Sequence, residues 1–340
     1  MHINSNSSNS LVSWNDNSDG LIVGHDGYHV FPKSWFCEQP VDLTFGLEMK
    51  PNLVLGPCDG IFCLYWTTRH RMQHHFTLPS IVLWNPSTRE ANMLPKSSFD
   101  FPPYKLVDDC IVGFGFDGKA KTYKVVKLVS FEVGDDEVNC TEVYTSSSGC
   151  WRFLQIGGNL QDVGLCSKPY SMYTNDVVFH WSLFQTGNMA VVSFDMGEEV
   201  FRVTPLPKKF NLFPYTDDRR KFHSLALLKD SLGVICSFYE DGCTTFVLWL
   251  MTQNHKVDDD DDPDSSWFRV STWGPLPGLY SPLGFWKNTE VLIQTGCNTS
   301  ELHGSPFLYD IVTQKHRELK LSGEPKFIYK QSLVSVTGGN

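Results

Sequence analysis

The first residues that could do chemistry form a group of potential metal ligands in the first quarter of the chain. His70, His74 and His75 lie between two strand-like segments, and Cys58 and Cys63 precede them. Imidazole nitrogen and thiolate sulfur are the ligands that zinc prefers, but structural zinc sites use paired ligands at short, regular spacing. No matching Cys-x-x-C pair follows these residues. We therefore predict a polar loop that joins two strands, and no metal.

A second candidate is the acidic run Asp258–Asp262, which Asp264 follows closely. Carboxylates bind calcium, but this run lacks the alternating ligands and the turning glycine of an EF-hand loop. Neighbouring like charges repel one another, and this favours a solvated loop. A second hypothesis stays open, in which the run attracts a partner protein that has a basic surface.

Catalytic and cofactor-binding patterns are missing from the sequence. His180 stands beside Trp181 in an apolar segment, where we expect a hydrogen-bonded structural histidine rather than a general base. There is no Gly-x-Ser-x-Gly elbow and no glycine-rich phosphate-binding segment. We predict no catalytic residue and no cofactor. The alternative is an enzyme on a propeller scaffold, carbohydrate-active or an oxidase, which would show converging carboxylates or metal ligands.

Composition narrows the class of protein further. The 340 residues carry a formal net charge of −10, whereas binding to nucleic acid requires a basic surface. A hydrophobic content of 41% with 14% aromatic residues is enough for a large core. The first ten residues have neither the basic start nor the apolar run of a signal peptide, and no segment has the length of a membrane span. We predict a cytoplasmic protein, with the nucleus also open, whose ten cysteines stay reduced.

The elements that must position any site are short strands with a repeated pattern. Five times an apolar strand ends in an aromatic residue before a turn, at intervals of 50 to 60 residues. These aromatic residues are Trp84, Tyr144, Phe194, Trp249 and Tyr309. A period of this size is typical of kelch propellers, whose blades have four strands. We predict an all-β, β-propeller-like (kelch-like) ring of about six blades, with the aromatic residues in its core.

The two ends of the chain also have strand-like patterns. We expect strands within residues 11–14, 20–30 and 332–336, and a final blade built from both ends would close the ring. Residues 1–10 are predicted to be disordered, and residues 11–337 to form a single domain. Asp117-Gly118 and Asp241-Gly242 lie between apolar runs, as hairpin turns do. The segment Asn85–Arg89 is interpreted as a turn rather than a binding loop.

An ordered series of motifs resembles the F-box-associated domains of plants over about residues 50–336. The series comprises Gly56-Pro57-Cys58-Asp59-Gly60-Ile61-Phe62-Cys63-Leu64, Leu83-Trp84-Asn85-Pro86-Ser87-Thr88-Arg89-Glu90, Gly113-Phe114-Gly115-Phe116-Asp117, Tyr123-Lys124-Val125-Val126, Val143-Tyr144 and Trp151-Arg152. Towards the carboxyl terminus the sequence resembles the S-locus F-box and S-locus F-box-like branch. The residues concerned are Gly274-Pro275-Leu276, Gly284-Phe285-Trp286 and Tyr309-Asp310.

The resemblance implies a non-catalytic protein-recognition domain. It is the kind that serves as the substrate receptor of an SCF-type E3 ubiquitin ligase and binds the protein to be ubiquitinated. In the S-locus branch that target is a pistil S-RNase. An F-box, which binds the Skp1 adaptor, would precede the domain, but residues 1–50 show no helical pattern of that kind. Skp1 is therefore expected as a partner only if an F-box lies upstream, and an F-box-less decoy binder is an alternative.

Partner binding is expected on the segments that differ most between the repeats, because loops carry specificity while strands pack. These segments are Thr67–Thr77, Asp100–Asp109, Phe210–Arg220, Asn254–Ser265 and Gly296–Ser305. Within them the candidate partner-binding residues are His70, His74, Tyr104, Asp108, Tyr215, Arg219, Asp259, Asp261 and His303. No nucleic acid and no membrane is expected as a partner.

Overall fold

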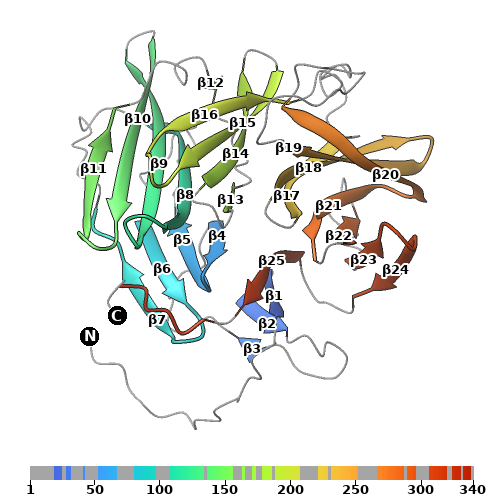
Figure 1. The fold of residues 1–340 in the computed structure, drawn as a ribbon, viewed down its shortest axis with the longest axis horizontal. Helices are drawn as coiled ribbons and strands as arrows, with labels where there is room; N and C mark the ends of the chain where they lie inside the picture. The colour runs from blue at the N-terminus through green and yellow to red at the C-terminus, as the bar shows by residue number, and fades with distance from the viewer. Residues whose placement is uncertain are drawn as a thin grey trace, which may run out of the picture.

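The structure is a computed structural model that describes the chain in segments, and the account below is confined to them. The described residues are 19–24, 28–31, 41–42, 53–66, 80–96, 107–133, 136–155, 163–164, 171–173, 178–185, 188–206, 221–228, 231–251, 266–286, 289–295, 306–319, 324–330 and 332–337. Within these segments every regular element is a β-strand, and the strands are arranged radially around a common centre (Figure 1). The all-β prediction is confirmed.

The first half of the chain forms three antiparallel sheets in succession. Sheet 1 contains β4 (Leu53–Cys58), β5 (Ile61–Trp66), β6 (Ser80–Asn85) and β7 (Glu90–Met93). Sheet 2 contains β8 (Val107–Asp117), β9 (Thr122–Val133), β10 (Asp136–Thr145) and β11 (Cys150–Leu154). Sheet 3 contains β12 (Val163–Gly164), β13 (Ser171–Tyr173), β14 (Val178–Gln185), β15 (Asn188–Asp195) and β16 (Phe201–Pro205).

The second half adds two more sheets and a terminal one. Sheet 4 contains β17 (Lys221–Leu228), β18 (Ser231–Glu240), β19 (Cys243–Met251) and β20 (Trp267–Pro277). Sheet 5 contains β21 (Tyr280–Phe285), β22 (Glu290–Thr295), β23 (Phe307–Asp310) and β24 (Lys315–Glu318). The terminal sheet has the order β25 (Glu324–Lys330), β1 (Asp19–Gly24), β2 (Tyr28–Phe31) and β3 (Val41–Asp42).

The terminal sheet confirms that both ends of the chain build the closing blade. β25 pairs antiparallel with β1, with Leu21 opposite Ile328. The position of the last strand was predicted wrongly, because residues 332–336 are not a strand and the closing strand is Glu324–Lys330. The apolar alternation of residues 332–336 suggested a strand, but side chains of sheet 1, rather than a neighbouring strand, bind their backbone groups.

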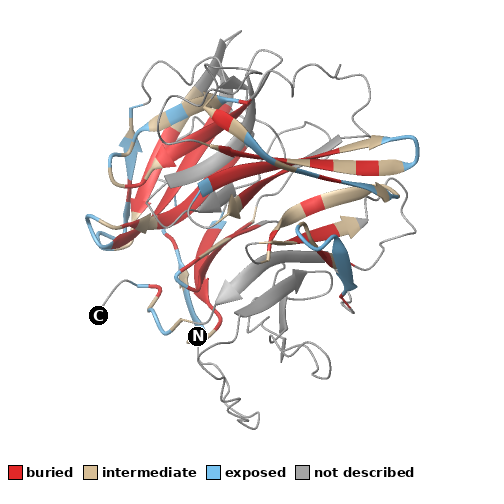
Figure 2. Cartoon of the chain, turned by 45° about the vertical axis from the view of Figure 1, so that its right-hand side comes forward, coloured by how far each residue is buried: buried red, intermediate tan, exposed pale blue. Residues whose placement is uncertain are grey.

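The repeated aromatic residues occupy one structural position. Trp84, Tyr144, Phe194, Trp249 and Tyr309 all lie in the third strand of their sheets, on β6, β10, β15, β19 and β23. None of the five is more than 5% exposed. Figure 2 shows the same pattern, with buried residues along the strands and exposed residues at the turns. The prediction that these aromatic residues form the core is therefore confirmed.

The first strands of several sheets have weak signals in the sequence. β4 precedes β5 in sheet 1, β12 and β13 precede β14 in sheet 3, and β17 precedes β18 in sheet 4. β4 contains Gly56 and Pro57, residue types that usually interrupt a strand pattern, and its register with β5 shifts between Leu55 and Cys58. Pairing with β5 overrides that local signal, because β5 supplies the hydrogen-bonding partner of β4.

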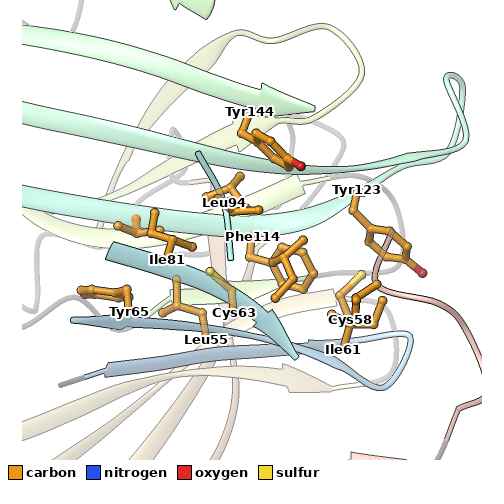
Figure 3. Packing of buried hydrophobic residues seen from close by; sticks show 14 of the residues in the cluster. Leu55, Cys58, Ile61, Cys63, Tyr65, Ile81, Leu94, Phe114, Tyr123 and Tyr144 are labelled. Carbon is orange, nitrogen blue, oxygen red and sulfur yellow. The ribbon is translucent and has the colours of Figure 1, made fainter. Parts of the chain in front are cut away.

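Packing between sheets 1 and 2 fixes their relative position. Figure 3 shows Leu55, Ile61 and Cys63 of sheet 1 facing Phe114 and Tyr123 of sheet 2. All five side chains are at most 4% exposed. Burying aromatic and aliphatic side chains of this size stabilises the folded state by about 1.5–3 kcal/mol each.

A hydrogen bond from a tryptophan ring to a proline carbonyl joins neighbouring sheets at two places in the ring. The Trp151 Nε1 donates a hydrogen bond of 2.8 Å to the Pro95 carbonyl oxygen, which links sheet 2 to the chain that leaves sheet 1. The Trp267 Nε1 donates an equivalent bond of 2.8 Å to the Pro205 carbonyl oxygen, between sheets 4 and 3. The same contact therefore recurs two sheets further along the chain.

Candidate protein-recognition surface

Three sheets have the same turn between their third and fourth strands. The Asp195 Oδ1 accepts hydrogen bonds from the backbone N–H groups of Gly197 and Glu198, both 2.9 Å. The Asp310 Oδ1 does the same for residues 312 and 313, at 2.9 and 2.8 Å, and the Asn85 Oδ1 accepts from the Ser87 N–H at 2.9 Å. Asparagine and aspartate favour such turns because their side chains mimic a backbone acceptor. The prediction that residues 85–89 form a turn is confirmed.

Both Asp-Gly pairs lie in hairpin turns, as predicted. Asp241 and Gly242 both have positive φ, 49° and 79°, as a two-residue type I′ turn requires. Asp117-Gly118 lies in a hairpin whose turn is longer and spans residues 118–121. Its geometry differs because the Asp117 Oδ1 accepts hydrogen bonds from the backbone N–H groups of Lys119 and Ala120, both 2.9 Å.

We call the edge of the ring that carries the turns between first and second strands and between third and fourth strands the turn face; it comprises residues 59–60, 86–89, 118–121, 146–149, 196–200 and 311–314. Hydrogen bonds join its members across sheet boundaries. The Tyr123 Oη donates to the Asp59 Oδ2 at 3.1 Å, which connects sheets 2 and 1. The Lys119 ammonium pairs with the Glu198 carboxylate, which connects sheets 2 and 3. The turn face is therefore cross-linked by its own side chains.

A buried lysine is the centre of the link between sheets 2 and 3. The Lys124 Nζ lies 2.7 Å from the Asp117 Oδ2, 2.7 Å from the Glu199 Oε1 and 2.7 Å from the Met196 carbonyl oxygen. The Arg152 guanidinium also pairs with Glu199. Burial by itself would raise the pKa of both carboxyl groups, but the hydrogen bonds they accept outweigh it. The pKa of Asp117 and the pKa of Glu199 therefore lie below their ordinary values.

Antiparallel pairing places the other connections at the opposite edge of each sheet. The strand ends that border Thr67–Thr77, Asp100–Asp109, Phe210–Arg220 and Gly296–Ser305 lie at this edge, because these segments follow second or fourth strands. Asn254–Ser265 differs, since it joins the third strand β19 to the fourth strand β20, at the level of the turn face. Four of the five predicted binding segments thus share one edge, which we call the open edge.

Most of the predicted partner-binding residues lie outside the described residues: His70, His74, Tyr104, Tyr215, Arg219, Asp259, Asp261 and His303. Asp108 is described through its backbone and lies near the start of β8. The register of β8 with β9 shifts between Val107 and Asp109, so Asp108 is the extra residue of an irregularity at the open edge. Bulges of this kind commonly occur at the rims of sheets and beside binding sites.

A described feature of the open edge was missed as a candidate site. It consists of Tyr239–Cys243 and Gly278–Tyr280, which we call the sheet-4 tip. The Gly278 N–H donates to the Gly242 carbonyl oxygen at 2.8 Å, and the buried Thr244 hydroxyl donates to the Gly278 carbonyl oxygen at 2.5 Å. The Thr244 oxygen also accepts from the Tyr280 N–H at 3.2 Å. These bonds join the hairpin to the chain that leaves sheet 4, so the tip is held in one geometry.

The chemistry of the sheet-4 tip suits protein recognition. Glu240 and Asp241 are exposed, and Tyr239 and Tyr280 are half-buried. Tyrosine is enriched at protein interfaces because it combines a large apolar ring with a polar end. Exposed carboxylates beside it attract positively charged surfaces. The signal that could have found this site is Tyr239-Glu240 immediately before the predicted Asp241-Gly242 turn.

The described residues contain no cluster of three or more histidine, cysteine, aspartate or glutamate side chains that could hold a metal ion. Cys58 and Cys63 are packed in the core between sheets 1 and 2, and burial raises the pKa of the Cys63 thiol well above its ordinary value. A thiol of this kind disfavours the thiolate that metals bind. His180 lies on β14, where the backbone alone is described. In the described segments no helix has the length and apolar character needed to cross a membrane.

Successive antiparallel sheets of four or five strands around a centre, with the last one shared by both ends of the chain, define a β-propeller. The chain belongs to the family of F-box associated beta propeller domains, which it matches over residues 32–336. The number of blades stays a prediction, although the described strands form six sheets.

Comparison with characterised proteins gives distant relatives with an F-box name. The chain is 25% identical to F-box protein At3g07870 of Arabidopsis thaliana over 277 residues, covering 73% of this chain and 58% of that protein. It is 25% identical to F-box protein CPR1 of the same plant over 146 residues, covering 38% of this chain and 35% of that protein. The chain thus spans between about a third and three fifths of the length of these relatives.

Among solved structures the chain resembles TolB from Acinetobacter baumannii, with a TM-score of 0.46, 12% identity and coverage of 91% of this chain and 64% of that one. It also resembles the Dos1 propeller, with a TM-score of 0.36, 11% identity and coverage of 91% and 66%.

Proposed function

We propose that this chain is the target-binding part of an F-box protein and works as the substrate receptor of an SCF-type E3 ubiquitin ligase. The observation that carries this proposal is its membership of the F-box associated family over residues 32–336, together with relatives named as F-box proteins. The domain itself is non-catalytic in this proposal. It holds the target while ubiquitin transfer takes place elsewhere in the ligase.

The target is bound at the open edge rather than at the turn face. Side chains of the turn face are already engaged within the chain: Lys124 pairs with Glu199, and the turn aspartates bind backbone N–H groups of their own turns. At the open edge, strand ends border four of the five predicted binding segments, and the sheet-4 tip presents tyrosines and carboxylates on a rigid support. A preformed surface of this kind loses little conformational entropy on binding.

A finer proposal concerns the target. The motifs that resemble the S-locus branch suggest a pistil S-RNase, and the net charge of −10 suits a basic partner. Skp1 would bind to an F-box in the same polypeptide. Sequencing the transcript across its 5′ end shows whether an F-box is encoded in frame. A transcript without one would support a decoy that binds targets and does not deliver them.

The general proposal can be tested by site-directed photo-crosslinking in plant tissue. A photoreactive amino acid replaces Glu240 at the sheet-4 tip in one variant and Thr88 on the turn face in a matched one. We expect the Glu240 variant to capture a protein whose half-life lengthens when this chain is depleted, and the Thr88 variant not to capture it. Equal capture by both variants, or a captured protein whose half-life does not depend on this chain, would argue against the proposal.

The S-RNase proposal is tested separately with purified proteins. Glu240→Lys at the tip and Glu318→Lys on β24 make the same change in net charge at two exposed positions. We expect Glu240→Lys to slow association with an S-RNase and to weaken its salt dependence, and Glu318→Lys to have little effect. Absence of binding across a panel of S-RNases would reject this target and leave the general proposal intact.

A further inference from the structure

The carboxyl-terminal segment 332–337, which we call the strap, lies against the turn Asn85–Glu90 of sheet 1. The Asn85 Nδ2 donates to the carbonyl oxygens of Ser332 at 3.0 Å and Val334 at 2.7 Å. The Ser87 Oγ accepts from the Ser332 N–H at 3.3 Å. The Glu90 Oε2 accepts from the Val336 N–H at 3.1 Å. All four bonds go to backbone groups of the strap.

One side chain of the strap enters the core. Val336 is 1% exposed and belongs to the cluster between sheets 1 and 2 that contains Leu55 and Phe114. Leu333, in contrast, is 88% exposed. The strap therefore reaches sheet 1 with its backbone and with one apolar anchor, directly after β25 has paired with β1 in the terminal sheet. In Figure 1 this red segment runs beside β6 and β7.

The residue type at position 85 separates this turn from its equivalents. Asp195 and Asp310 occupy the same position in sheets 3 and 5, and their Oδ1 atoms accept the turn hydrogen bonds. An aspartate could do the same at position 85, because the turn needs an acceptor alone. The two bonds to the strap need a side-chain N–H donor, which asparagine has and aspartate lacks. Asn85 is fully buried. Its Oδ1 accepts the turn hydrogen bond and its Nδ2 donates to the strap.

We propose that the turn Asn85–Glu90 is a binding site for a peptide backbone, and that its occupant is the chain's own strap. The site recognises two carbonyl groups, two N–H groups and one apolar side chain, which together describe a peptide with an aliphatic residue at its fifth position. The strap then works as a second closure of the ring. Pairing of β1 with β25 completes the terminal sheet, and the strap fastens that sheet to sheet 1. This inference is independent of the proposed ligase function.

Hydrogen–deuterium exchange on the full chain tests the proposal. Asn85→Asp keeps the acceptor for Ser87 and removes the donors to the strap. We expect the amides of Ser332 and Val336 to lose roughly tenfold or more of their protection, while the amides of the Asn85 turn keep theirs. The matched control is Asp310→Asn, which keeps its turn acceptor and lies in a different turn from the one that binds the strap. It should leave exchange in residues 332–337 unchanged.

Two further variants separate loss of the strap from a general loss of folding. Ser87→Ala and Glu90→Ala each remove one acceptor, for the Ser332 and Val336 amides respectively. We expect each variant to raise exchange chiefly at its own partner amide and to leave exchange in β9 and β19 unchanged. If the Ser332 and Val336 amides exchange equally fast in the wild-type chain and in all three sheet-1 variants, the strap is not bound there and the proposal is wrong.

Discussion

Replacement of Glu142 tests whether the buried ion pair of sheet 2 stabilises the fold. The Lys127 Nζ lies 2.7 Å from the Glu142 Oε2, and the two side chains are 2% and 4% exposed. The two residues face one another on β9 and β10. The Lys127 Nζ also lies 4.0 Å from the centre of the Trp151 ring, and Trp151 is the residue that links sheet 2 to Pro95.

The expected magnitude follows from what each substitution leaves behind. Glu142→Gln preserves the shape of the side chain and leaves a buried lysine charge without a counter-charge. Breaking a buried pair in this way costs about 3–5 kcal/mol of unfolding free energy. Lys127→Met removes the cation that lies beside the Glu142 carboxylate and should cost a similar amount. The double variant Lys127→Met/Glu142→Leu has no charge left to compensate, so it should lie within about 1–2 kcal/mol of the wild type.

The assay is a double-mutant cycle measured by denaturant unfolding at neutral pH. The energy of interaction between the two substitutions is the quantity of interest, because each single variant includes the penalty of an unpaired charge. Glu198→Gln, which breaks the exposed pair with Lys119, is the control and should leave the midpoint of unfolding unchanged. If the two single losses simply add in the double variant, the charges do not compensate one another and the reasoning fails.

Three other predictions concern the contacts between and within sheets. Because Asp117 and Glu199 have lowered pKa values, their stabilisation is present above the ordinary carboxyl range and is lost as the pH falls through the lowered values; acid titration of unfolding should show this loss below the ordinary carboxyl range, with a smaller slope in Lys124→Met. Trp267→Phe removes the bond to the Pro205 carbonyl oxygen and should cost at least about 1 kcal/mol in urea unfolding, whereas a neutral result would show that the bond contributes nothing. Gly233→Ala places a Cβ 2.9 Å from the Trp249 carbonyl oxygen and 2.8 Å from a Leu250 methyl group, so it should cost about 1–3 kcal/mol; an unchanged unfolding midpoint would contradict this close packing.

Much of the fold could be predicted because its signals are local and repeated. Each aromatic residue of the 50-to-60-residue series follows an apolar strand and precedes a turn, and the structure places all five in third strands. Asp241-Gly242 predicts its type I′ turn because few other residue pairs adopt positive φ at both positions. The first strands of several sheets were harder to predict. β4 contains Gly56 and Pro57, and its hydrogen-bonding partner β5, rather than its own sequence, makes it a strand.

The candidate site was predicted less completely than the fold. Variable segments indicate where specificity lies, but they do not show that four of them border the same edge of the ring. That follows from the alternating direction of the strands. The sheet-4 tip was not predicted from the sequence because its rigidity depends on Thr244. Thr244 binds both Gly278 and Tyr280, which lie more than thirty residues further along the chain. A contact at that separation leaves no pattern in the sequence.

The amino-acid sequence alone determined the class of this protein. Strand periodicity, turn residues and an ordered motif series are local properties that the order of the residues specifies. The tertiary structure alone decided how distant residues are used. It placed Val336 in the core between sheets 1 and 2, and it gave Asn85 a second function as a donor to Ser332 and Val334. The physical reason is that a side chain can satisfy backbone groups almost 250 residues away only after the ring has brought the two ends of the chain together.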